Sequence, residues 1–248
     1  NEHTLQRGRG FGALGLANVE ILLGLQPRQH LGHVLSGDAS ISDVLVEGPG
    51  GMSILPASSG VKSLTHLSEE EHMRFVLAME EVEDDFDLLV LDTAAGIGDN
   101  VMFFVSASQD VFVVVTPEPT SITDAYATIK VMSRSHGVKR CRLLINQVKD
   151  ADEALHVYNQ LVSVADTFLT DVSIKYQGFV AKDPNVPRAV IAQNLLLESK
   201  PESPAAECVD RVARDYLSEA SSPTPVGSMG FFWRRLLEQQ RANSARGI

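Results

Sequence analysis

The chain has 248 residues, of which 44% are hydrophobic and 6% aromatic, as is usual for an α/β protein of one or two domains. Its net charge of −11 argues against a general nucleic-acid-binding protein, because phosphate binding needs clustered lysines and arginines. Two cysteines cannot make a disulfide framework, no apolar run approaches the roughly 20 residues of a transmembrane helix, and no signal peptide is recognisable. A cytoplasmic protein is therefore expected.

The first notable stretch is "RGRGFGALGLANVEILLGL", from Arg7 to Leu25. It contains a formal G-x-G-x-x-G at Gly10 to Gly15. A dinucleotide-binding fingerprint needs a buried strand before it, and the preceding "NEHTLQR" is polar. We therefore interpret this motif as a coincidence.

From Met52 onward, short apolar runs alternate with longer amphipathic stretches. This alternation predicts an α/β fold with a mostly parallel sheet and helices on both faces. Helix ends carry recognisable caps: Ser68 with Glu71, Gly137 as a terminator, and Ser203 followed by Pro204. The strands are expected at 52–58, 86–94, 110–117, 141–148 and 172–181, and the helices at 67–85, 100–109, 121–137, 151–166, 186–197 and 203–220.

An acid and a glycine follow the strand expected over 86–94. Asp92 precedes Gly96 by four residues, the spacing of a Walker-B and switch-II segment. The carboxylate can hold a metal-bound water, and the glycine lets a backbone N–H approach a terminal phosphate. An Asp that only caps the following loop explains the motif equally well, because D-x-x-x-G is common.

Polar residues also follow the next three strands. Glu118, Asn146 and Asp183 lie at or just beyond their carboxyl ends, where open parallel sheets bind ligands. Asn146 could pair with a purine edge. Each residue alone is weak evidence, and Asn146 alone is better explained as a turn former. Their common place at one sheet edge is what favours a ligand site. His30 and His33 have helical spacing without a further ligand, so a solvated helix face is favoured over a metal site.

Six stretches together resemble the MinD/ParA-type P-loop ATPases, and within them the flagellar-number regulators called FlhG or FleN. The resemblance runs from about Leu14 to Leu217. It implies an ATPase that uses ATP and Mg²⁺ and forms a homodimer face to face around two nucleotides. The stretches are "LGLANVEILLGL", "SILPASSGV", "FDLLVLDTAAGIGDN", "VVTPEPTSITDAYATIK", "LLINQV" and "DPNVPRAVIAQNLLL".

The resemblance also implies roles for individual residues. Asp92 would hold Mg²⁺ through water and Gly96 would be the switch-II glycine. Asn146 would face the adenine, the Asp183 loop would cover the base, and Glu118 would reach the nucleotide across the dimer. Asp124 would lie on a dimer or partner surface. The partners implied are a signal-recognition-type GTPase and a flagellar transcription activator, with no direct nucleic acid.

The chain departs from this family at its beginning. The family has a P-loop with two lysines, whereas the first lysine here is Lys62. The family also has two acids in a D-x-D just before "LGLAN", and those positions are Phe11 and Ala13 here. No catalytic acid is therefore intact, and Mg-ATP binding and hydrolysis should be poor. Three explanations are open: an incomplete or frame-shifted sequence, which is favoured, a degenerate pseudo-ATPase, or a different nucleotide site.

The C-terminal end differs in charge from the rest. Residues 230–248 carry four arginines and one glutamate, for a net charge of +3. The side chains of Phe232, Trp233, Leu236 and Leu237 share one helical face, with Phe231 at its edge and Arg234 and Arg235 elsewhere. This pattern predicts a helix in a membrane interface, and docking on the protein itself or on a partner is the alternative.

The expected organisation is an atypical segment over 1–13, a MinD-like domain over 14–219, a linker over 220–229 and a membrane-targeting helix over 230–248. The expected function is an ATP-dependent switch that regulates flagellar number or placement from the inner face of the bacterial cytoplasmic membrane, crippled in this chain. Two alternatives are a non-hydrolysing interaction protein and a cell-division site selector of the same fold.

Overall fold

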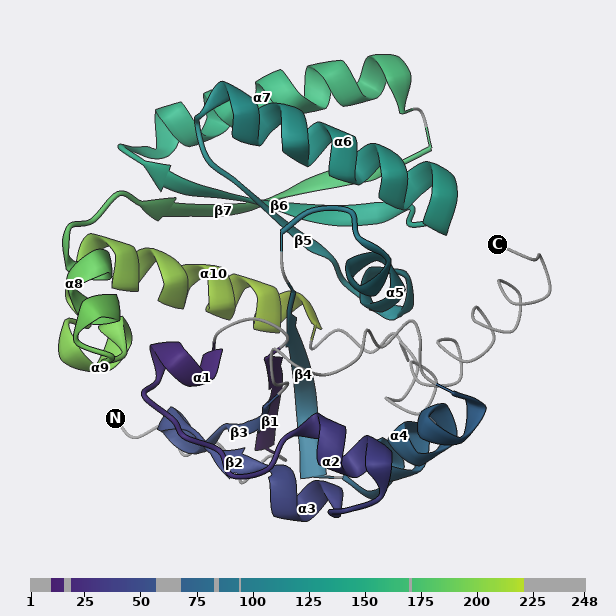
Figure 1. Ribbon diagram of the computed structural model, residues 1–248. Helices are drawn as coiled ribbons and strands as arrows, with labels where there is room; N and C mark the ends of the chain where they lie inside the picture. Colours follow the sequence, from purple (N-terminus) through teal and green to yellow (C-terminus); the bar gives the residue numbers. More distant parts are fainter. Residues whose placement is uncertain are drawn as a thin grey trace. The chain divides into compact units, whose positions relative to one another are not determined.

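The computed structural model describes residues 10–15, 19–56, 68–82, 85–93, 95–169 and 171–220. The described residues fall into two compact units. The first contains the chain up to Ala95 together with Asp99–Ala107, and the second contains Gly96–Gly98 and the chain from Ser108 onward (Figure 1). The linker from Ser221 and the helix expected over 230–248 lie outside the described residues.

The first unit holds a four-stranded sheet in the order β2-β3-β1-β4. Strand β1 pairs in parallel with β3 and β4, and β2 pairs antiparallel with β3. At the carboxyl end of the sheet, Gly15 of β1 is paired with Asp92 of β4. The strands are β1 (Gly10–Gly15), β2 (Val46–Glu47), β3 (Ser53–Pro56) and β4 (Phe86–Asp92).

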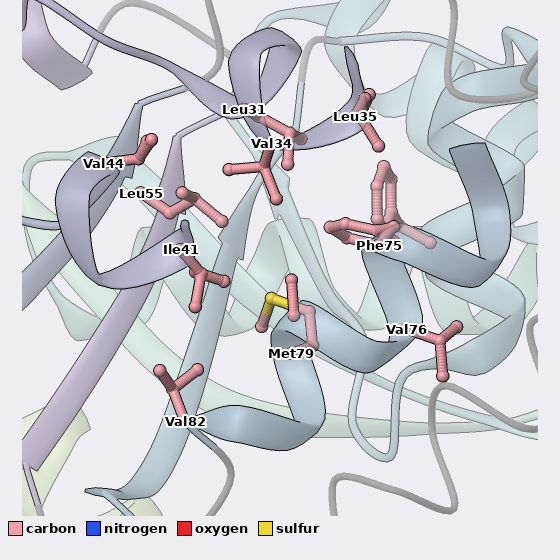
Figure 2. Packing of buried hydrophobic residues seen from close by; sticks show 12 residues of the cluster. Leu31, Val34, Leu35, Ile41, Val44, Leu55, Phe75, Val76, Met79 and Val82 are labelled. Carbon is pink, nitrogen blue, oxygen red and sulfur yellow. The ribbon is translucent and has the colours of Figure 1, made fainter. Parts of the chain in front are cut away.

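Helices pack on this sheet around an apolar core. Figure 2 shows Leu31, Ile41, Leu55 and Phe75 of this core converging from α2, α3, β3 and α4. Leu89 and Leu91 of β4 pack against the same cluster. The helical segments of this unit are α1 (Val19–Leu22), α2 (Leu31–Ser36), α3 (Ile41–Val44), η1 (Pro49–Gly51), α4 (Glu69–Glu81) and α5 (Asp99–Ala107).

The start of α4 confirms the cap predicted from the sequence. Ser68 Oγ accepts a hydrogen bond from the Glu71 backbone N–H at 3.2 Å, and the Glu71 carboxylate accepts one from the Ser68 N–H at 2.7 Å. These two bonds satisfy backbone donors that the helix itself leaves free. The strand expected over 52–58 is found as β3, and the helix expected over 67–85 is found as α4, each with ends within four residues of the expected ones.

The second unit is a three-layered α/β unit. Its parallel sheet has the order β5-β6-β7, with α6 and α7 on one face and α10 on the other (Figure 1). This arrangement confirms the predicted class of a mostly parallel sheet with helices on both faces. The elements are β5 (Phe112–Val115), α6 (Pro119–His136), β6 (Arg140–Val148), α7 (Ala151–Phe168), β7 (Ser173–Ala181), α8 (Asn185–Ile191), α9 (Leu196–Ser199) and α10 (Pro204–Ala220).

The single helix expected over 186–197 is wrong, because two short helices occupy this stretch. Gln193 has a φ of 52°, and the Asn194 N–H bonds back to the Ala189 carbonyl at 3.0 Å. The Gln193 N–H bonds to the Val190 carbonyl at 3.1 Å. These two bonds form a Schellman motif, which ends α8 before α9 begins.

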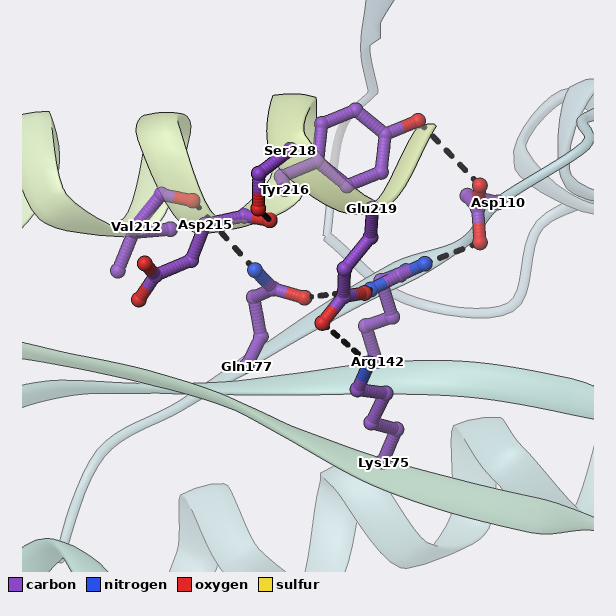
Figure 3. Close-up of polar contacts among 9 residues, drawn as sticks. All are labelled: Asp110, Arg142, Lys175, Gln177, Val212, Asp215, Tyr216, Ser218 and Glu219. Carbon is purple, nitrogen blue, oxygen red and sulfur yellow. Dashed lines mark hydrogen bonds and ion pairs between the residues drawn. The ribbon is translucent and has the colours of Figure 1, made fainter. Parts of the chain in front are cut away.

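Helix α10 is held to the sheet by a polar network near its last turn (Figure 3). Arg142 of β6 donates to Asp110 at 2.9 Å, to Gln177 at 2.7 Å and to Glu219 at 2.8 Å. Glu219 also accepts from Lys175 of β7 at 2.5 Å. The network therefore holds the last turn of α10 against β6 and β7.

None of the helices in the described ranges combines the length and apolarity that a membrane span needs. Within the same ranges, no group of three or more His, Cys, Asp or Glu side chains is placed to hold a metal ion. His30 and His33 instead cap the start of α2: His30 Nδ1 accepts from the Gly32 N–H at 3.0 Å, and His33 Nδ1 accepts from the His30 N–H at 3.2 Å. Both histidines therefore have a structural role at the start of α2.

Candidate functional site

The carboxyl ends of β5, β6 and β7 form one edge of the second sheet. Val115 is paired with Ile145, and Asn146 is paired with Val180. Because the three strands are parallel, the segments that follow them leave from the same edge. Glu118, Asn146 and Asp183 therefore lie at or just after strand ends of this one edge, which are the positions that the sequence predicted.

The loop after β5 is closed by a hydrogen bond between its backbone and the first turn of α6. The Thr116 backbone N–H donates to Ser121 Oγ at 3.0 Å across the start of α6. Glu118 immediately precedes α6, is exposed, and makes no side-chain cap to the helix. Its carboxylate is accordingly available to a ligand or a partner. Asp124 is exposed one turn into α6.

Asn146 lies at a bulge near the end of β6. Gln147 has a φ of 59°, and the pairing with β7 shifts between Asn146 and Val148. Asn146 Oδ1 accepts a hydrogen bond from the Gln147 N–H at 2.9 Å. The Asn146 amide is therefore oriented by the backbone, with its NH₂ group directed away from that bond.

The Asp183 carboxylate organises the loop after β7. It is only 5% exposed and accepts hydrogen bonds from the Asn185 N–H at 2.8 Å and from Asn185 Nδ2 at 2.9 Å. Its second oxygen accepts from the Ala205 N–H at 3.2 Å, at the first turn of α10. The hydrogen bond from the Asn185 backbone is the main reason that the pKa of Asp183 lies below its usual value. Asp183 thus holds the loop through its carboxylate.

Asp92 belongs to the four-stranded sheet of the first unit, and not to the sheet of β5, β6 and β7 as expected from the sequence. It ends β4, beside Gly15 of β1, and it is exposed. Loss of hydration raises the pKa of its carboxyl, since a less hydrated site disfavours the charged form. A bound cation would lower that pKa again.

Strand β1 carries the two positions at which the resemblance expects acids. Phe11 is paired with Leu88 and Ala13 with Val90, both on the Asp92 strand. The G-x-G-x-x-G lies along β1 itself and not in a strand-to-helix turn, which agrees with its interpretation as a coincidence. The expected acids would therefore stand on the strand next to Asp92.

Gly96 has a φ of 108°, in the region that favours glycine, and nothing lies within 4 Å of a side chain built there. A backbone N–H at such a position can be approached closely.

The pocket lined by Ile41, Leu55 and Phe86 has only apolar side chains and Ser53 around it, so it offers no charged group for a phosphate.

Comparison with known proteins decides the family. The antiactivator FleN of Pseudomonas aeruginosa is 44% identical over 232 residues, which are 94% of this chain and 82% of FleN. The chain belongs to the FleN/FlhG family of MinD/ParA-type ATPases. No family model matches the sequence.

Further relatives of this FleN/FlhG-family chain agree. The flagellum site-determining protein YlxH of Helicobacter pylori is 29% identical over 91% of the chain and 77% of YlxH. MinD of Aquifex aeolicus has a TM-score of 0.65 at 19% identity, with 85% of each chain covered. MinD of Pyrococcus horikoshii, solved with Mg-ADP, has a TM-score of 0.64 at 17% identity, with 88% of each chain covered. These structures establish the MinD-like P-loop NTPase fold.

The residues of this FleN/FlhG-family chain fit one part of Mg-ATP better than the other. The edge with Asn146 has an oriented amide and two pre-formed loops, which suit a base. The phosphate part fits less well, because Phe11 and Ala13 have no oxygen for metal-bound water. We therefore derive no hydrolytic step for this chain.

Sequence reasoning missed Gln147 in this site. Its left-handed conformation has no signal in the sequence, since glycine and asparagine are the residues that usually signal such a position. The sequence showed Asn146 but not how the next residue orients its amide.

Proposed function

We propose that this FleN/FlhG-family protein is a MinD-like nucleotide switch that regulates flagellar number or placement. The observation that carries the proposal is its 44% identity to the antiactivator FleN across 82% of that protein. The shared edge of Glu118, Asn146 and Asp183 supports ATP as the ligand, because it offers an oriented amide for a purine and two fixed loops around it.

The proposed roles of the phosphate-side residues follow their positions. Asp92 holds Mg²⁺ through a water molecule and Gly96 lies against the terminal phosphate. Phe11 and Ala13 leave the metal and the attacking water without carboxylates. We expect weak ATP binding and almost no ATP hydrolysis, so the switch is crippled in the chain as given.

Dimerisation and membrane association complete the proposal. Two copies meet through the nucleotide edge, with the exposed Asp124 on a dimer or partner surface. The helix expected over 230–248 binds the inner face of the cytoplasmic membrane through its apolar face. One such helix binds marginally, since burial of each large side chain contributes at most ~1.5–3 kcal/mol while ordering costs ~1–2 kcal/mol per residue. Two helices on a dimer gain avidity.

Partner proteins are proposed by chemistry and by family. A signal-recognition-type GTPase and a flagellar transcription activator are the expected partners, and direct binding of nucleic acid is not expected from a chain of net charge −11. Sedimentation with anionic liposomes tests the membrane part. If deletion of residues 230–248 leaves the bound fraction unchanged, that part is wrong.

Two other functions are supported by specific observations. A non-hydrolysing interaction protein is favoured by Phe11 and Ala13, which remove the acids but no partner surface. A cell-division site selector is favoured by similarity to the septum site-determining protein MinD of Bacillus subtilis, 26% identical over 71% of the chain. Calorimetric titration with Mg-ATP separates the first from the switch, because a protein that retains only the partner surface gives no heat of ATP binding. A flagellar-number phenotype in a deletion strain, with normal division sites, separates the second.

A further inference from the structure

Strand β6 contains one more residue than its partner needs near its carboxyl end. Asn146 is paired with Val180 and Val148 with Ala181, so Gln147 is left without an opposing residue in β7. This is a β-bulge, which shifts the alternation of side chains. Val148 is consequently fully buried one position after the exposed Gln147.

The bulge requires an unusual backbone conformation. Among the described residues, only Gln147 and Gln193 combine a positive φ with a side chain. Gln193 has an ordinary reason for it, since it ends α8 in a Schellman motif. Gln147 lies inside a central strand, where such a conformation persists only because its surroundings hold it.

The bulge presents the Gln147 N–H to the Asn146 side chain. The 2.9 Å bond from this N–H to Asn146 Oδ1 holds the amide oxygen against the backbone. An amide group that is free to turn over can exchange its donor and its acceptor. The bond to Gln147 prevents that exchange and gives Asn146 one fixed donor and acceptor pattern.

A fixed pattern matters for recognition of a purine. At the Watson–Crick edge, adenine offers an N6 donor and an N1 acceptor, whereas guanine offers an O6 acceptor and an N1 donor. These two patterns are mirror images, so an amide that turns over can serve both bases. An amide held in one orientation can serve only one of them.

We propose that Gln147 is a positioning residue that sets the base selectivity of this edge by fixing the Asn146 amide. This inference rests on the proposed nucleotide-binding function and goes beyond it. Gln147 acts through its backbone, so residues that tolerate a positive φ can replace it, and β-branched residues cannot.

The test compares variants at the two glutamines with positive φ. The full chain is titrated with Mg-ATP and Mg-GTP, and the ratio of their dissociation constants is measured. Gln147→Gly and Gln147→Asn should keep the ratio of the parent chain, expected at about tenfold from one good bidentate pair. Gln147→Val should reduce the ratio to about twofold or less, because valine disfavours the positive φ that presents the backbone N–H to Asn146. Gln193→Val places the same strain elsewhere in the unit and should leave the ratio unchanged.

Hydrogen exchange provides a readout without nucleotide. The Gln147 amide hydrogen should exchange roughly three- to tenfold faster in Asn146→Ala, the factor that one hydrogen bond contributes. The Lys149 N–H, which donates to the Glu153 carboxylate at 2.6 Å, is the matched control and should not change. Unchanged exchange at Gln147 would show that its bond to Asn146 Oδ1 does not hold the amide, whether or not Gln147→Val folds.

The outcomes separate this inference from the proposed function. A parent chain that prefers ATP and a folded Gln147→Val variant with the same preference would overturn the inference and leave the function standing. A parent chain that binds neither nucleotide would overturn the proposed function. The exchange experiment would still show whether the Gln147 N–H holds the Asn146 amide.

Discussion

The Asp183 carboxylate accepts a hydrogen bond at 3.2 Å from the backbone N–H of Ala205, which lies 22 residues later. This bond joins the loop after β7 to the first turn of α10. A negative charge at a helix N-terminus is favourable, and here it is also buried and bonded to Asn185. One side chain therefore fixes both the candidate base loop and the start of α10.

Asp183→Asn should lower the stability of the second unit at neutral pH, because the amide can accept through only one oxygen. The hydrogen bonds hold the folded pKa of Asp183 below its ordinary value of 3.8. Its contribution to stability is therefore present above that value and is lost as the pH falls through the lowered folded value. Urea unfolding between pH 7 and pH 3 measures this. Asp215→Asn, an exposed change on α10, is the control, and equal pH profiles for Asp183→Asn and the parent would contradict the prediction.

Arg142→Met should destabilise the chain by about 1–3 kcal/mol, because it leaves Asp110, Gln177 and Glu219 without their shared donor. The Arg142 side chain is 15% exposed. Arg214→Met is the matched control, since Arg214 is 77% exposed in its pair with Asp210. It should change the free energy of unfolding by less than about 0.5 kcal/mol. Equal effects of the two substitutions would show that the network in Figure 3 does not stabilise α10.

Gly178→Ala should be costly for two reasons. Gly178 has a φ of 136°, and a Cβ atom there would lie 2.9 Å from Val212 Cγ2 of α10. Strain and overpacking together should lower the free energy of unfolding by about 2–4 kcal/mol. Gly137→Ala meets only the first penalty, since its φ is 68° and nothing lies within 4 Å. Chemical denaturation of both variants compares the two losses, and a loss for Gly178→Ala no larger than that for Gly137→Ala would contradict the prediction.

Acid should weaken the cap of α2. Burial, and next the neighbouring His33, lower the pKa of His30 below its ordinary value of 6.5. The folded state then binds a proton less readily than the unfolded state, so stability is full above pH 6.5 and falls as the pH drops below it. His30→Asn should keep a cap and remove this part of the pH dependence between pH 7.5 and 5.5. His156→Asn, an exposed change, should not, and the same slope in both variants would refute the assignment.

The class of fold and most of its second half could be predicted from the sequence. Ser68, Glu71 and Gly137 carry local signals for helix ends, and each was found in its expected role. Asn146 and Asp183 could be placed at one edge because the parallel topology brings strand ends together. These features depend on neighbours in sequence or on a simple alternation.

Other features depend on tertiary context. Gln147 and Gln193 adopt a positive φ, which glutamine does not favour. Neither the bulge nor the break between α8 and α9 could therefore be predicted from the sequence. The buried position of the Asp183 carboxylate follows from Ala205, which is distant in the chain. The division into two sheets, with Asp92 in one and Asn146 in the other, follows from which strands pair and not from the strands themselves.

The central claim is that this chain binds ATP through the edge at Asn146 and lacks the acids to hydrolyse it. Calorimetric titration of the full chain with Mg-ATP, with Mg-GTP as reference and phosphate release followed in the same samples, tests it most directly. The account predicts saturable but weak heat that is larger for ATP than for GTP, with phosphate release at background. No heat with millimolar Mg-ATP, or rapid turnover in spite of Phe11 and Ala13, would contradict it.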